Sequence, residues 1–248
     1  MDSHELTDTL PWLRSGNDFL LAAVGRLTDD ELREPSGLPG WSRAHLVAHI
    51  ARNAEALGRL AAWARTGVET PMYASPDQRN ADIEESAGYP AGRLREELAS
   101  TAADLSKALG ELDEAAWRSS LRSAQGRSIP ATEVPWMRVR EVWLHTVDLA
   151  TGAQMADLPA GVLDALTTDV CGTLSSREGC PAVLLWPSDR AIPVRLGPQD
   201  VEPVTLSGSA ADLTGWLVGR GGGRGGAAGL NAKDGRGEVA VPVAPRWL

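Results

Sequence analysis

Glu141 and His145 stand four residues apart in the segment MRVREVWLHTVDL. In a helix this spacing places the carboxylate and the imidazole on the same face. His49, in HLVAHIARN, lies in a second segment with helical spacing of apolar residues and can complete a set of two histidines and one carboxylate. A catalytic zinc needs three such protein ligands, because the open fourth position accepts the reacting group. The spacing therefore predicts a catalytic metal site if the two helices meet.

The same residues allow other interpretations. Charged side chains on a helix usually form a solvated face, and a glutamate four residues before a histidine is common. His45 lies four residues before His49, so a three-histidine site with Glu141 as a base is also possible. Asp148 can orient the His145 imidazole from behind, or it can form an ion pair with an arginine on the helix surface. Spacing alone leaves these alternatives open.

Composition limits the class of protein. The chain has 248 residues, 43% of them hydrophobic and 23% charged, and a formal net charge of −9. These values are typical of a globular protein, and the acidic balance argues against nucleic acids or anionic membranes as partners. No stretch approaches the roughly 20 apolar residues of a membrane span. The acidic start MDSHELTD lacks the apolar core of a signal peptide, so we expect a cytoplasmic protein with no obligate protein partner.

The first 150 or so residues predict helices. Their apolar residues recur at helical spacing in four long segments, and Ser42 is a suitable N-cap for the second of them. A run of turn-forming residues, TGVETPMYASPDQRN, predicts a connection between the second and third helices. The predicted helices cover residues 5–27, 43–66, 91–109 and 132–151, the last ending at a glycine stop at Gly152. Four helices of similar length indicate an antiparallel four-helix bundle.

Beyond about residue 158 the pattern changes to short β-type runs mixed with helices, which indicates a smaller α+β domain. The predicted strands are 182–186, 191–196, 202–208 and 238–243, and the predicted helices are 160–176 and 209–220. The fold class is thus mainly α plus α+β. We place the domains at residues 1–154 and 155–248.

The C-terminal domain holds the other residues with chemical potential. The glycine-rich run 219–226 matches GxGxxG, but it follows a helix instead of a strand, so it predicts a loop and not a dinucleotide site. Arg220 at its start can grip a carboxylate or can be an ordinary surface arginine. Cys171 and Cys180 are too far apart for a CxxC motif. We expect them to be idle thiols in a reducing compartment.

Several segments together resemble the mycothiol-dependent maleylpyruvate isomerase family. They are GWSRAHLVAHIARNAEAL, ETPMYASPDQRNADI, AQGRSIPATEVPWMRVREVWLHTVDL, the VGRG turn and the C-terminal PRWL. The resemblance covers the N-terminal bundle almost continuously and is patchy beyond it. The bundle is also similar to the broader DinB-like metal-binding family.

The resemblance implies specific roles. It implies a zinc ion held by His49, Glu141 and His145 with water in the fourth position, and it favours His49 over His45. It also implies that Arg220, from the C-terminal domain, is needed for activity. Mycothiol would provide the thiol that neither cysteine of the chain supplies.

The implied reaction is the cis–trans isomerisation of maleylpyruvate to fumarylpyruvate in the gentisate pathway of aromatic degradation. A thiolate adds to the double bond, the bond rotates, and the thiolate leaves; a metal stabilises the thiolate that this requires. Arg220 would act on the substrate, with Arg79 and Arg138 as further substrate-binding candidates. One alternative is a mycothiol S-transferase that conjugates an electrophile at the same site. Another is a non-catalytic zinc-binding regulatory module.

Overall fold

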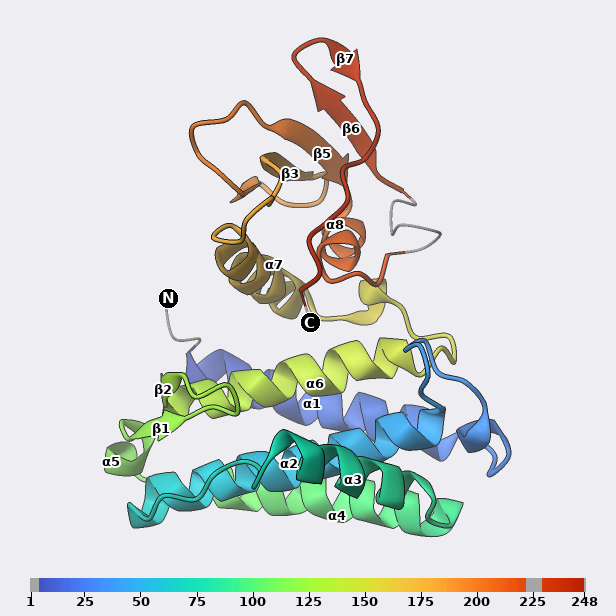
Figure 1. Ribbon diagram of the computed structural model, residues 1–248, viewed down its shortest axis with the longest axis vertical. Coiled ribbons are helices and arrows are strands. Elements are labelled where there is room, and N and C mark those ends of the chain that lie inside the picture. The colour runs from blue at the N-terminus through green and yellow to red at the C-terminus, as the bar shows by residue number, and fades with distance from the viewer. Residues whose placement is uncertain (1–4, 222–228, 248) are drawn as a thin grey trace. The chain divides into compact units, whose positions relative to one another are not determined.

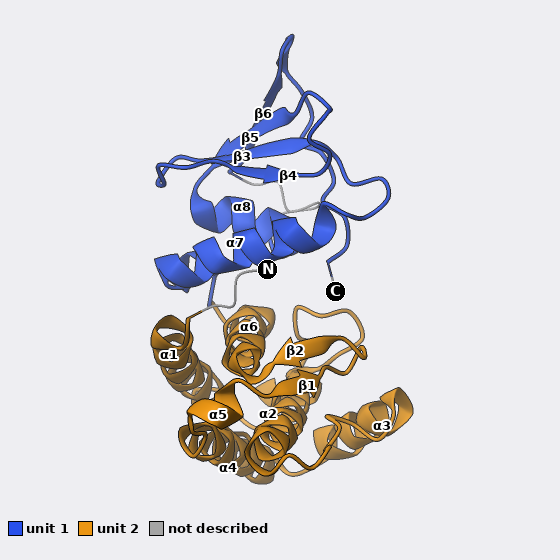
Figure 2. Ribbon diagram, turned by 90° about the vertical axis from the view of Figure 1, so that its left-hand side faces the viewer, with its two compact units in different colours: residues 1, 153–248 blue, residues 2–152 orange. Residues whose placement is uncertain are grey.

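The structure, a computed structural model, describes residues 5–221 and 229–247. The chain divides into two compact units, an N-terminal one that ends at Gly152 and a C-terminal one that begins at Ala153 (Figure 2). None of the helices in the described part of the chain combines the length and the hydrophobicity that a membrane span requires.

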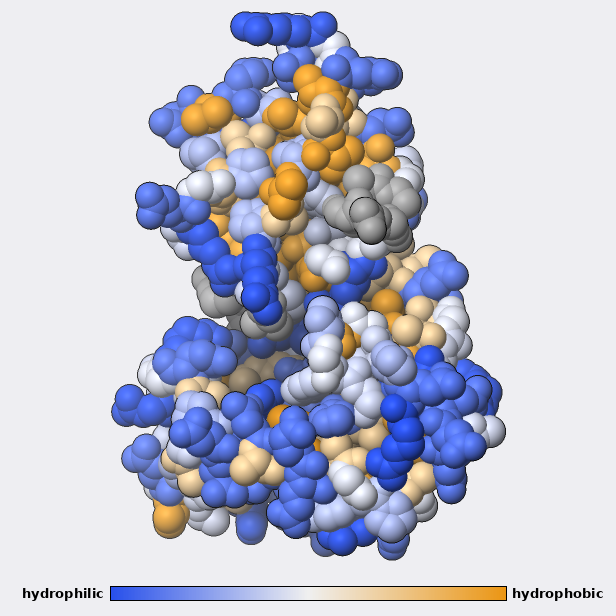
Figure 3. Space-filling view, turned by 45° about the vertical axis from the view of Figure 1, so that its right-hand side comes forward, coloured by the Kyte–Doolittle hydropathy of each residue, from blue (hydrophilic) through white to orange (hydrophobic). Residues whose placement is uncertain are grey.

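The N-terminal unit is a four-helix bundle with short additional elements (Figure 1). The four long helices are α1 (Leu6–Gly25), α2 (Arg43–Thr66), α4 (Ala91–Gly110) and α6 (Val134–Asp148). The smaller elements are η1 (Glu31–Arg33), α3 (Pro76–Ala87), α5 (Glu114–Trp117), η2 (Ala131–Glu133) and the antiparallel pair β1 (Ser120–Arg122) and β2 (Ser128–Pro130). Figure 3 shows a mostly hydrophilic outer face on this unit, as expected when the apolar stripe of each helix faces inward.

Contacts between helices fix their directions. Along α1 and α6, Trp12 packs against Trp136 and Phe19 stacks on Trp143, so these two helices run the same way. At the start of α2, Arg43 donates to the carbonyl of Leu149 just beyond the end of α6, so α2 runs the opposite way. This confirms the predicted bundle fold.

The helix α4 also runs opposite to α1. Near the start of α4, Arg95 donates to the carbonyl of Leu27 just after α1 ends, with 2.7 Å between the two atoms. The helix α3 makes this arrangement possible because it carries the chain back along the bundle between α2 and α4 (Figure 1). The sequence prediction of a plain connection here was wrong over its last part. Ser75 caps α3 by accepting from the Gln78 amide, and Pro76 suits its first turn.

The last bundle helix is shorter than predicted. It begins at Val134 after a 3-10 turn and ends at Asp148, before the glycine stop expected at Gly152. Ala150 takes a left-handed conformation with φ of 54°, which ends the helix two residues earlier than the glycine. The end of the helix is held by the Gly37 amide, which donates to the Asp148 carbonyl at 2.7 Å. A Cβ added at Gly37 would lie only 3.1 Å from that oxygen, so glycine allows this close approach.

The C-terminal unit is an α+β layer pair. Its elements are η3 (Met155–Asp157), α7 (Ala160–Leu174), α8 (Ala210–Leu217) and a sheet of β3 (Val183–Pro187), β4 (Val194–Leu196), β5 (Val204–Gly208), β6 (Asn231–Asp234) and β7 (Gly237–Glu238). The strand order is β4-β3-β5-β6-β7, with β3 and β5 parallel and the other pairs antiparallel. Both helices cover the same face of the sheet (Figures 1 and 2).

The strand prediction needs correction at two places. Of the run 238–243 only Glu238 belongs to a strand, β7, although the Val239 amide still donates to the Ala232 carbonyl of β6. Pro242 within the run has no amide hydrogen to donate to a sheet. The residues Asn231–Asp234 form β6, which was not predicted. They lack the β-branched residues that favour strands, and the strand exists because it pairs with β5.

Candidate metal centre

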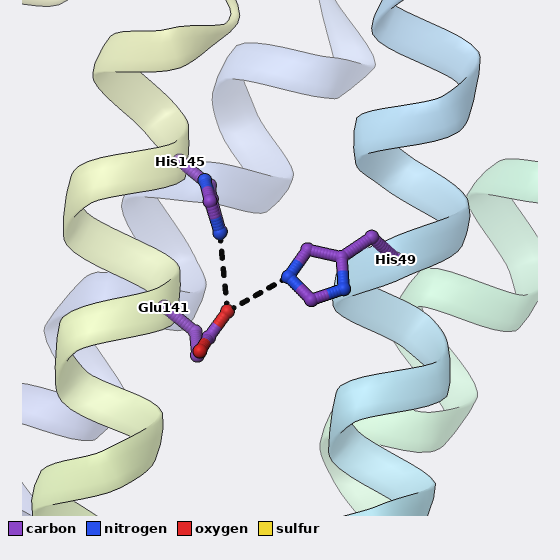
Figure 4. Close-up of side chains that lie close together, drawn as sticks. All are labelled: His49, Glu141 and His145. Carbon is purple, nitrogen blue, oxygen red and sulfur yellow. Dashed lines mark hydrogen bonds and ion pairs between the residues drawn. The ribbon is translucent and has the colours of Figure 1, made fainter. Parts of the chain in front are cut away.

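His49, Glu141 and His145 point toward one another from α2 and α6 (Figure 4). The Glu141 Oε2 atom lies 3.0 Å from Nε2 of His49 and 3.1 Å from Nε2 of His145. The two imidazole rings meet edge to face, with 5.0 Å between their centroids. Each residue offers a ligand atom within 4.8 Å of the others, so the group can hold a metal ion.

The structure separates His45 from this group. Ser42 caps α2 by accepting from the His45 amide, and the His45 Nδ1 atom lies 2.6 Å from the Ser42 hydroxyl oxygen. The other ring nitrogen, Nε2, lies 3.3 Å from Glu84 on α3. Both ring nitrogens of His45 are therefore engaged at the helix start, one turn away from His49.

Asp148 supports His145 from behind. Its Oδ2 atom lies 2.8 Å from the His145 Nδ1 atom, and the residue is only 5% exposed. An ionised carboxylate at this position accepts a hydrogen from Nδ1. The Nε2 atom of neutral His145 then carries the lone pair, directed toward Glu141, as a metal ligand requires.

The environment shifts the pKa values of all three candidate ligands. Burial acts to raise the pKa of Glu141, but hydrogen bonds from His145 and His49 hold it well below its usual range. Burial acts to lower the pKa of His145, yet the hydrogen bonds to Asp148 and Glu141 raise it above its ordinary value. Burial lowers the pKa of His49, with Glu141 opposing this only in part. The group thus combines a carboxylate that stays ionised with one imidazole that holds a proton less strongly than usual and one that holds it more strongly.

Arg79, predicted to bind substrate, lies beside the three ligands. Its Nη2 atom is 3.2 Å from Nδ1 of His49, and its guanidinium lies 5.7 Å from the centre of the Tyr73 ring. Burial is the main cause of a raised pKa at Tyr73, so the phenol keeps its proton. The Trp41 ring is also close to His49, with 5.4 Å between its centroid and that of the imidazole. Sequence reasoning missed Tyr73 and Trp41 as neighbours of the site, although both belong to the segments that carry the family resemblance.

Arg138 is buried, whereas the substrate-binding role predicted for it requires an accessible side chain. The residue is 0% exposed inside the bundle, and its Nη1 atom donates to the Ile50 carbonyl and to Asn53 of α2. A side chain with no exposed surface cannot take a substrate carboxylate from solution. This placement argues against substrate binding by Arg138.

Arg220 belongs to the C-terminal unit, directly after α8. Its backbone amide donates to the Gly215 carbonyl at 2.7 Å, and its Nη1 atom donates to the Val218 carbonyl at 2.9 Å. The side chain thus folds back over the end of its own helix. Within the glycine-rich run 219–226, the residues from 222 onward lie outside the described part of the chain.

Both cysteines are free and buried. Burial raises the pKa of Cys171 to about 12 and raises that of Cys180 as well. Neither sulfur forms a thiolate readily at neutral pH, in line with the idle role predicted for them.

A helical bundle with two histidines and a carboxylate converging from facing helices defines a class of proteins with a metal-ligand set in the bundle core. Residues 13–150 match the family model of the mycothiol maleylpyruvate isomerase N-terminal domain, so the chain belongs to this family. The resemblance stated from the sequence is thereby confirmed.

Solved structures agree with this assignment. The chain is similar to a mycothiol-dependent maleylpyruvate isomerase and to a histidine-to-alanine variant of it, each with 34% identity over 100% of both chains and a TM-score of 0.88. A fold likeness at 15% identity and a TM-score of 0.51 covers 60% of this chain and 88% of YfiT from Bacillus subtilis, described as a probable metal-dependent hydrolase with an unusual four-helix bundle topology. Comparison with the curated proteins gives no match.

Proposed function

We propose that this protein is a zinc- and mycothiol-dependent isomerase that converts maleylpyruvate to fumarylpyruvate. The similarity over the full length to an enzyme of that name carries the proposal. The convergence of His49, Glu141 and His145 supports it. The reaction would belong to the gentisate pathway, and we place the protein in the cytoplasm.

The donor set suits zinc. Two imidazole nitrogens and one carboxylate oxygen are common zinc ligands, and three protein ligands leave one position for a reacting group. Asp148 holds His145 in the tautomer that presents Nε2, which is the usual outer support for a zinc histidine. With zinc and mycothiol bound, the site would supply a thiolate that adds reversibly to the cis double bond and allows it to rotate.

The protein side chains then have separate tasks. His49, Glu141 and His145 hold the metal, and Asp148 orients His145. Arg79 is placed beside His49 and is suited to binding a carboxylate of the substrate. We assign Arg220 the task of stabilising the negative charge that develops on the substrate. Because Cys171 and Cys180 are buried, the chain contributes no thiol of its own.

The test is a direct assay. Purified protein is incubated with mycothiol and maleylpyruvate, with and without a chelator, and the cis isomer and the products are followed. Conversion to fumarylpyruvate that needs both mycothiol and the metal is the expected result. A stable thioether product would instead identify an S-transferase. Full activity of metal-free protein would contradict the proposal.

A further inference from the structure

Arg138 is a buried cation that has no role in the proposed mechanism. It lies on α6 three residues before Glu141, so the two side chains occupy neighbouring positions on one face of the helix. The residue is 0% exposed. Apolar residues of similar volume usually fill such positions at lower cost, because a buried charge loses its hydration. The burial of a guanidinium at this position therefore needs an explanation.

Its hydrogen bonds join the two helices that carry the candidate metal ligands. The Nη1 atom lies 2.7 Å from the Ile50 carbonyl oxygen and 2.9 Å from Oδ1 of Asn53. Ile50 directly follows His49, and Asn53 lies one turn further along the same face of α2. The guanidinium therefore connects α6 to α2 at the level where His49 faces Glu141.

The charge of Arg138 is influenced by Glu141, which is one of the candidate ligands. Burial lowers the pKa of Arg138 to about 10, while the nearby Glu141 carboxylate raises it, so the guanidinium is charged at neutral pH. The Nε and Nη2 atoms are buried and have no hydrogen-bond partner within the described chain. Hydrogen bonding thus accounts for only one side of the guanidinium. The Glu141 carboxylate favours the charged form of Arg138 from a distance.

We propose that Arg138 is a positioning residue for the metal centre. It fixes α2 against α6 so that Nε2 of His49 and Nε2 of His145 both meet Oε2 of Glu141. This inference rests on the proposed metal site. It assigns Arg138 no contact with substrate.

The experiment uses metal binding and ligand geometry as readouts. Arg138→Lys keeps the charge but loses the planar fork, Arg138→Met loses both, and Asn53→Ala removes one acceptor while keeping the arginine. Each full-length variant is titrated with Zn²⁺ and with Co²⁺, and the visible absorption of the Co²⁺ protein reports the ligand geometry. Thermal unfolding of the metal-free protein is measured in parallel.

A matched control separates positioning from packing. Thr101→Val removes a buried hydroxyl on α4 that bonds within its own helix, to the Glu97 and Leu98 carbonyls. We expect it to change the unfolding temperature without affecting Co²⁺ binding. The Arg138 and Asn53 variants should bind metal about 10- to 100-fold more weakly and show an altered Co²⁺ spectrum.

Two outcomes decide the proposal. If Arg138→Lys and Asn53→Ala bind Co²⁺ with unchanged affinity and spectrum, Arg138 is a packing residue only and the proposal is wrong. If Arg138→Met does not fold, Asn53→Ala still provides the decisive comparison. Isomerase activity is not a readout here, so a wild-type protein that binds metal but does not isomerise maleylpyruvate counts against the proposed function alone.

Discussion

The Nη2 atom of Arg79 lies 3.2 Å from the Nδ1 atom of His49. A guanidinium only donates hydrogen bonds, so Nδ1 accepts and the proton of neutral His49 sits on Nε2. That proton faces Oε2 of Glu141 at 3.0 Å. Coordination through Nε2 requires the opposite tautomer, whose Nδ1 hydrogen would point at the guanidinium. Coordination of a metal through Nε2 of His49 and the Arg79–His49 hydrogen bond therefore exclude each other.

This relationship predicts the behaviour of Arg79→Met. The variant should bind Zn²⁺ several-fold more tightly because the competing donor is gone. Its KM for maleylpyruvate should rise about 10- to 100-fold because a charge-assisted hydrogen bond to the substrate is lost. Competition with a chromophoric chelator measures the first effect, and steady-state kinetics measure the second.

The chain offers a matched control for this variant. Arg93 lies over the Tyr89 ring, 3.5 Å from its centroid, as Arg79 lies near Tyr73, but its ion pair is with Glu97 and not with a candidate ligand. Arg93→Met should leave both constants unchanged. If Arg79→Met and Arg93→Met had the same Zn²⁺ affinity and the same KM, Arg79 would have no role at the site.

A second prediction concerns the ligand set itself. Glu141→Gln and His145→Ala should lose metal and activity together, because each removes one of three ligands and leaves buried polar partners unsatisfied. His45→Ala should retain metal and lose only its ring contacts to Ser42 and Glu84, because Ser42 still caps the helix through the backbone amide of residue 45. Metal analysis of the purified variants checks both statements. A His45 variant without metal would restore the three-histidine alternative.

The sequence could predict most of this bundle and part of its site. Helical periodicity identified the four long helices, and the i, i+4 spacing placed Glu141 and His145 together, because both are local properties. Spacing could not distinguish His49 from His45 as the ligand, because residues four apart lie on the same face of a helix. Tertiary contacts decide it, because Glu84 of α3 meets His45 whereas Glu141 of α6 meets His49.

Other features depend on partners that a sequence does not reveal. The strand β6 forms because β5 lies beside it, despite unfavourable residues. The burial of Arg138 follows from acceptors on α2 that are 85 and 88 positions away in sequence. Its residue type suggested a surface group for a substrate carboxylate, and only the packing of α2 on α6 shows otherwise.

A third prediction tests the support of His145. Asp148→Asn should weaken Zn²⁺ binding about 10- to 100-fold, because the neutral amide holds the Nδ1 hydrogen less strongly. Chelator competition gives the affinity. Glu84→Gln is the matched control, since Glu84 pairs with His45 in the same way but outside the ligand set. Equal affinities in the two variants would contradict an orienting role for Asp148.

A fourth prediction concerns pH. The raised pKa of His145 means that metal uptake must displace a proton from it, whereas His49, with its lowered pKa, is already neutral. Zn²⁺ affinity should therefore begin to fall above the ordinary histidine pKa of 6.5 as the pH is lowered. Without metal the sign is reversed, because a raised pKa stabilises the fold below 6.5 and this stabilisation is lost as the pH rises through the folded-state pKa.

Thermal unfolding with and without Zn²⁺ between about pH 5 and pH 9 checks this behaviour. The stabilisation by metal should grow with pH across this window. Asp148→Asn removes a cause of the raised pKa of His145. In this variant the pH range over which stabilisation by metal grows should therefore move to lower pH. A metal effect that does not depend on pH would show that His145 is not a ligand.

The last prediction separates binding of the metal from turnover. Arg220 lies in the C-terminal unit and is not among the three candidate ligands, so Arg220→Ala should keep its metal and its unfolding temperature. Its kcat should fall about 100- to 1000-fold if the guanidinium stabilises negative charge that develops on the substrate. Arg236→Ala, at an exposed turn between β6 and β7 of the same unit, is the control and should keep full activity.

Because the Arg220 side chain also bonds to the Val218 carbonyl, Arg220→Lys distinguishes a role in catalysis from a role in the fold. Partial recovery of kcat by lysine would indicate that the charge matters, while loss of folded protein in both variants would show that Arg220 serves the fold of its own unit.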